Sequence, residues 1–165
     1  MPENPVSHLV LDLRQGEVMI INGAPIRFRT RSRIELTAHA RFLFGKQIIP
    51  PDQVNSPARR IYFALQSAYI GEEEEREANL ESARYFIADF QQATTSELIR
   101  QLLTQALTAA EADDFYHALK LARRVLAHED AVLGTTNEQR NSAGDEAVRR
   151  NEGSRRETVA AAGTA

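Results

Sequence analysis

The sequence contains no cysteine, so disulfide bonds, thiol nucleophiles and thiolate metal ligands are all excluded. It also lacks any run of the ~20 consecutive apolar residues that a membrane-spanning helix needs. Its first residues are polar and lack the charged and then apolar regions of a secretory signal peptide. These absences predict a cytoplasmic protein that has no membrane partner.

Recognisable catalytic signatures are missing as well. The sequence has no nucleophile elbow, no triad motif and no glycine-rich loop that would hold phosphates. Asp113, Asp114 and His117 have the spacing of a two-point metal clip, but two ligands do not complete a site. A helix cap and a surface histidine explain these residues better. We therefore expect no enzymatic activity, no metal and no cofactor.

Charge is divided unevenly along the chain, although the whole carries a formal net charge of −3. Residues 1–60 contain nine Arg or Lys and five Asp or Glu, whereas residues 61–133 contain six and thirteen. Residues 134–165 contain five of each. A basic first part joined to an acidic second part indicates two surfaces with different partners.

Short strands are predicted in the first fifty residues. Apolar runs end in turn signals at Arg14-Gln15-Gly16 and at Asn22-Gly23, and Asn-Gly strongly favours a two-residue hairpin turn. The runs at 42–44 and 48–49 predict a last strand or two before two prolines end the sheet.

From residue 56 the apolar spacing becomes helical and predicts four helices. Their predicted starts are Ser56-Pro57, the acidic run Glu72–Glu75, a capping box at Thr94–Glu97, and Asp113 or Asp114. Residues 135–165 hold no aromatic residue and few large aliphatic ones. The predicted fold class is α+β: a small antiparallel N-terminal β-sheet with a basic surface at 1–50, an acidic helical bundle at 51–134, and a disordered C-terminal tail at 135–165.

An alternating run of arginines is the most informative pattern. On one continuous strand, Arg27, Arg29, Arg31 and Arg33 would share a face at intervals of ~6.6 Å and track a phosphate backbone, with Phe28 pointing inward. If residues 30–32 form a turn, the arginines instead cluster at a hairpin tip. A solvated strand face, or a sheet edge protected by charge, is the competing explanation. The cations that would extend the surface are Arg14, Arg41, Lys46, Arg59 and Arg60.

Three segments carry a family resemblance: residues 11–24, residues 45–51, and residues 56–66 with Tyr69. They are similar to segments of the FlbT family, and the similarity covers residues 9–70 and continues as a helical pattern to about 133. It implies a post-transcriptional repressor that binds the 5′ untranslated leader of flagellin mRNA and affects translation and degradation of that mRNA. One departure is Phe44, where family members often carry a basic residue that would be available to RNA.

The family supplies no RNA-contacting residues, so the candidates come from charge: Arg14, Arg27, Arg29, Arg31, Arg33, Lys46, Arg59 and Arg60. The implied partners are flagellin mRNA and flagellin or another small flagellar regulator, with self-association left open. A shorter similarity, at residues 14–20, is to the first hairpin of the carbon storage regulator, a dimeric β-protein that binds mRNA leaders. The alternative is a protein-interaction module, or a flagellin chaperone-like adaptor, that does not bind RNA directly.

Overall fold

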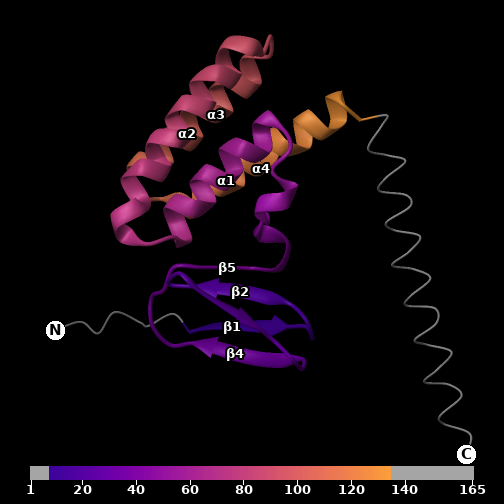
Figure 1. Cartoon of the computed structure of the whole chain (residues 1–165), viewed down its shortest axis with the longest axis vertical. Helices are drawn as coiled ribbons and strands as arrows, with labels where there is room; N and C mark the ends of the chain where they lie inside the picture. The colour runs from indigo at the N-terminus through magenta and orange to yellow at the C-terminus, as the bar shows by residue number, and fades with distance from the viewer. Residues whose placement is uncertain (1–7, 135–165) are drawn as a thin grey trace, which may run out of the picture. The chain divides into compact units, whose positions relative to one another are not determined.

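The structure, a computed structural model, describes residues 8–134 (Figure 1). The strands are β1 Leu9–Leu13, β2 Val18–Ile21, β3 Ala24–Arg27, β4 Ser32–Leu36 and β5 Phe42–Phe44. Two 3-10 helices follow, η1 Gly45–Gln47 and η2 Pro51–Gln53, and then α1 Pro57–Ile70, α2 Glu73–Ala93, α3 Glu97–Glu111 and α4 Phe115–Val132. The predicted order of antiparallel strands and then helices is confirmed. The tail predicted at 135–165 lies outside the described residues.

Residues up to Val125 belong to one compact unit, and the contacts described below lie within it. Its strands form two antiparallel sheets: β1 pairs with β4, and β2 lies between β3 and β5. Asn22 and Gly23 join β2 to β3 with φ angles of 47° and 83°, as the predicted two-residue turn requires. Of the last strand or two expected at 42–44 and 48–49, only β5 forms, because Ile48 is the C-cap of η1 and neither residue at 48–49 pairs in a sheet.

The two sheets share one apolar core. Leu11, Leu13 and Met19 are buried at its centre, and partly buried side chains pack around them: Ile21, Phe28, Ile34, Leu36, Phe42 and Phe44. Phe44 stacks on Phe42 with ring centroids 6.5 Å apart. Phe44, where a departure from the family pattern was expected, is therefore part of the core.

The arginine run does not lie on one strand. β3 ends at Arg27, β4 begins at Ser32, and the two strands belong to different sheets, so residues 28–31 cross from one sheet to the other. Phe28 causes this path because its ring packs into the shared core. Its N–H donates to the Glu17 carbonyl at 3.0 Å and its own carbonyl accepts from Gly16 N–H. The expected continuous strand and hairpin tip are both wrong.

Side-chain caps start three of the helices. Ser56 Oγ accepts from Arg59 N–H at 3.2 Å at the predicted start of α1, and Asp114 Oδ1 accepts from His117 N–H at 3.3 Å before α4. The capping box predicted at Thr94–Glu97 does not form, because Thr94 is the C-cap that follows α2 and Ser96 is the residue that caps α3. No helix within residues 8–134 is long and apolar enough to cross a membrane.

Burial within α3 predicts unequal effects of the same substitution. Leu103 is 0% exposed and Leu98 is 59% exposed. We expect Leu103→Ala to lower the free energy of unfolding by ~2–5 kcal/mol, because it leaves a cavity in the helical core. Leu98→Ala, the matched control, should change it by at most ~0.5 kcal/mol. Urea denaturation followed by circular dichroism measures both, and equal losses would contradict the assigned helix face.

Candidate functional site

One end of the strands gathers positive charge. In the observed register, the end of β1 lies beside the start of β4, and the ends of β3 and β5 lie beside the start of β2. The tight turn at residues 14–17 joins β1 to β2 and brings the two sheets together at this end. We call this region the basic end, and its cations are Arg14, Arg27, Arg29, Arg31 and Lys46.

Local contacts explain why these cations converge. Leu13 pairs with Ser32, so Arg14 and Arg31 each stand one residue beyond the last pair of the β1–β4 ladder. Cα atoms at opposite positions of such a ladder are only ~4.5–5.5 Å apart. Glu17 closes the turn by accepting from Arg14 N–H at 2.9 Å, and a Cβ on Gly45 would meet the same carboxylate. Therefore η1, which carries Lys46, also reaches this end.

The arginines of the crossover are available to a ligand. Arg27, Arg29 and Arg31 are exposed, and their guanidinium groups have no hydrogen bond or ion pair within the described part of the chain. Arg33 differs, because its Nε lies 3.9 Å from Asp12 Oδ1 on the paired strand. Both of these side chains are more than half exposed, so their attraction is weak and screened by salt.

The remaining candidates lie elsewhere in the fold. Arg59 and Arg60 are in the first turn of α1, where Arg59 Nη1 donates to Ser56 Oγ at 3.3 Å, and the strand register does not bring them to the basic end. The prediction that Arg41 extends the basic surface is wrong. Its Nη2 donates to both carboxylate oxygens of Asp113, at 2.7 and 2.9 Å.

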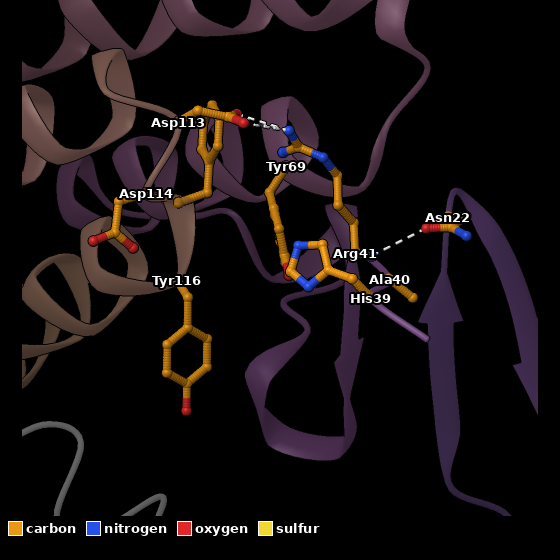
Figure 2. A pocket seen from close by; sticks show the side chains of 9 residues that line it. Asn22, His39, Ala40, Arg41, Tyr69, Asp113, Asp114 and Tyr116 are labelled. Carbon is orange, nitrogen blue, oxygen red and sulfur yellow. Dashed lines mark hydrogen bonds and ion pairs between the residues drawn. The ribbon is translucent and has the colours of Figure 1, made fainter. Parts of the chain in front are cut away.

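Arg41 instead ties the β-strands to the helices. Its guanidinium carbon lies 5.6 Å from the ring centroids of Tyr69 in α1 and Phe115 in α4, a distance typical of a cation–π contact. Its backbone N–H donates to Asn22 Oδ1 at 3.0 Å. Figure 2 shows the guanidinium directed at the Asp113 carboxylate, while Asp114 points away from it. Asp113 adopts a φ of 63° in this turn.

An open cavity of about 470 Å³ surrounds this tie (Figure 2). It is lined by Asn22, His39, Ala40, Arg41, Tyr69, Asp113, Asp114, Phe115 and Tyr116. The Arg41–Asp113 pair neutralises its own charge, and the described residues contain no group of three side chains that would hold a metal. No sequence motif marks this cavity, because its walls come from segments that only folding brings together.

A smaller cavity of about 170 Å³ shares Tyr116 with the first. Its lining is Leu43, Gln47, Tyr62, Tyr116, Leu119, Lys120 and Arg123. Arg123 Nη2 donates to the Lys46 carbonyl at 3.1 Å, so this cavity adjoins the basic end. Sequence reasoning missed Tyr116, Lys120 and Arg123, although their spacing places all three on one helix face.

The acidic side chains of the helices form a separate feature. Glu73, Glu74 and Glu75 are exposed in the first turn of α2, as expected for a solvated helix start. Further along α2, hydrogen bonds to Glu77, Glu111 and Glu81 raise the pKa of Arg84 above its ordinary value. The bond to Glu111 bridges α2 and α3 on the helix surface, whereas Glu77 and Glu81 lie in α2 with Arg84.

Comparison with known proteins identifies the family. The model of the family described as flagellar protein FlbT matches residues 9–133. The chain belongs to the FlbT family. The flagellum biosynthesis repressor protein FlbT of Caulobacter vibrioides is 30% identical over 83% of this chain and 97% of that protein. A probable flagellum biosynthesis repressor FlbT of Mesorhizobium japonicum is 32% identical over 76% of this chain and 85% of its own length.

No solved structure matches the chain. The names of the FlbT relatives support a role as a repressor of flagellum synthesis. The predicted resemblance is therefore confirmed. A family of regulators is also consistent with the prediction of a protein that is not an enzyme.

The Arg41 tie predicts different effects for two neighbouring carboxylates. Asp113→Asn removes the charge that faces Arg41, and we expect it to lower the free energy of unfolding by about 1 kcal/mol. The loss should be smaller at high salt, because salt already screens the attraction in the wild type. Asp114→Asn is the matched control, because asparagine caps a helix as well as aspartate does. Urea denaturation at low and high salt compares the two variants. Equal stability of both variants would show that the Arg41–Asp113 pair contributes nothing.

Proposed function

We propose that this FlbT family member represses flagellin expression after transcription, by binding the 5′ untranslated leader of flagellin mRNA through its basic end. The observation that carries the proposal is the exposure of Arg27, Arg29 and Arg31 without carboxylate partners in the described part of the chain. A guanidinium in this state can bind a phosphate bidentately without first breaking an ion pair. Arg14 and Lys46 add charge at the same end.

The bend at residues 28–31 suits a flexible polyanion better than a flat strand would. The arginines follow a crossover between two sheets, so they are presented on a loop rather than in one straight row. Binding there releases counterions from the RNA and is therefore strongly dependent on salt. A protein bound on the leader covers it from ribosomes and alters its access to nucleases, which gives repression with an effect on mRNA decay.

The charge of the helices restricts where RNA binds. Residues 61–133 contain thirteen Asp or Glu and six Arg or Lys, so most of this surface repels phosphate. The exposed acidic start of α2 stays available to a protein partner while the basic end holds RNA. In this proposal flagellin, or another small flagellar regulator, binds the helices and reports the state of assembly.

The test compares binding of a labelled flagellin leader by the wild-type chain and by the Arg27→Ala, Arg29→Ala, Arg31→Ala triple variant. Each lost contact with single-stranded RNA lowers the slope of log affinity against log salt by ~0.7, so we expect a slope smaller by about two. Affinity should fall at least tenfold (about 1.4 kcal/mol) at moderate salt. The matched control replaces the same residues with Lys, which keeps the charge and should keep the salt slope.

Two results would contradict the proposal. Unchanged RNA binding by the alanine variant would remove the basic end as the site. Failure of the wild type to bind any leader RNA, together with co-purification of flagellin, would favour the adaptor that does not bind RNA.

A further inference from the structure

We infer that the cavity of about 170 Å³ beside the basic end receives an unpaired base of the RNA, stacked on Tyr116. The inference rests on the proposed function and adds a site that the charge pattern did not contain. It also specifies the form of RNA that is bound: single-stranded, because the bases of a duplex are already stacked and hidden. The cavity is smaller than the ~300–1,000 Å³ of pockets that enclose a drug-sized ligand, so it suits one planar ring system.

Tyr116 has the geometry of a stacking platform. Tyr116 is 51% exposed and borders both cavities. Figure 2 shows its ring directed away from the Arg41–Asp113 pair, so that pair does not use it. Lys120 Nζ already lies over one face of the ring, 5.1 Å from its centroid, so a base stacks on the opposite face. Stacking of a base on such a ring tolerates any sequence, because every base has a π-face.

The walls of the cavity include packed apolar side chains, and a polar side chain among them carries a free donor. Leu43, Tyr62 and Leu119 are buried and line it. Gln47 Oε1 accepts from Phe44 N–H at 3.1 Å, which fixes the orientation of the side-chain amide. Within residues 8–134, Gln47 Nε2 donates to no acceptor. This amide can therefore donate to a carbonyl or ring nitrogen on the edge of a base.

The positive charge of the cavity fits a nucleotide, which carries a phosphate, better than it fits an uncharged ring. Its lining includes Lys120 and Arg123 and no carboxylate. Arg123 is held in place, with its guanidinium carbon 5.5 Å from the Tyr62 ring centroid and its Nη2 bonded to the Tyr62 hydroxyl at 3.0 Å. The same Nη2 bonds the Lys46 carbonyl, which connects the cavity to the basic end. An RNA strand that passes from the basic end beyond Lys46 thus meets the cations Lys120 and Arg123 beside the ring of Tyr116.

The experiment measures binding of the full chain to a labelled single-stranded leader oligonucleotide and to a duplex of the same length. We expect Tyr116→Ala to weaken single-strand binding about tenfold, with the salt slope unchanged because no phosphate contact is lost. Tyr116→Phe keeps the ring and should bind like the wild type. Tyr85→Ala removes a tyrosine that is 69% exposed on α2, and it serves as the matched control without effect.

The outcomes separate this inference from the proposed function. If the arginine variant loses affinity but Tyr116→Ala does not, or if duplex binds as tightly as single strand, the base site is overturned and the basic end stands. If the wild type binds no RNA, both proposals fail. Circular dichroism checks that Tyr116→Ala is folded, and Gln47→Glu offers a second variant. It places a carboxylate in the cavity, and undiminished binding by this variant would also overturn the inference.

Discussion

The contact between Arg41 and its surroundings is the constraint on which the arrangement of this unit depends. The Arg41 guanidinium is bonded to Asp113 and lies against the rings of Tyr69 and Phe115. The backbone N–H of Arg41 is bonded to Asn22. Arg41 thereby joins the β2–β3 turn, the segment before β5, α1 and the turn before α4. The apolar core around Leu11, Leu13 and Met19 is built from strand residues, so polar ties help to orient the strands against the helices. Arg41 supplies one of these ties, and the Tyr69 hydroxyl supplies another by accepting from Phe42 N–H at 3.3 Å.

That orientation has a functional result, because it sets α4 beside η1. Arg123 then bonds the Lys46 carbonyl, and the cations of α4 continue the basic end of the strands. The division of the sequence into a basic part and an acidic part therefore does not fully hold in the folded structure. Lys120 and Arg123 come from the acidic half of the chain, yet they line the cavity next to the basic end.

Much of the fold was predictable from the sequence, because its signals are local. The Asn22-Gly23 turn, the Ser56 cap and the inward position of Phe28 each follow from a few neighbouring residues, and each prediction was confirmed. A turn at residues 30–32 was one of the two expectations, but the change of sheet between β3 and β4 was not predictable, since alternation of apolar and charged residues continues across it while the pairing partner changes. Arg41 was misplaced because its role depends on a contact with Asp113, 72 positions away. Tyr116 was missed because it lines a cavity that no motif marks.

The crossover at residues 28–31 separates the residue that anchors the loop from the residues that carry its charge. One partly buried ring, that of Phe28, fixes the path of the loop, and the arginines on either side contribute nothing to that anchor. Substitution at those flanking positions can therefore adjust affinity for a polyanion without disturbing the scaffold. In the proposed function, single substitutions there would tune the affinity of the basic end for RNA while the path of the loop is kept.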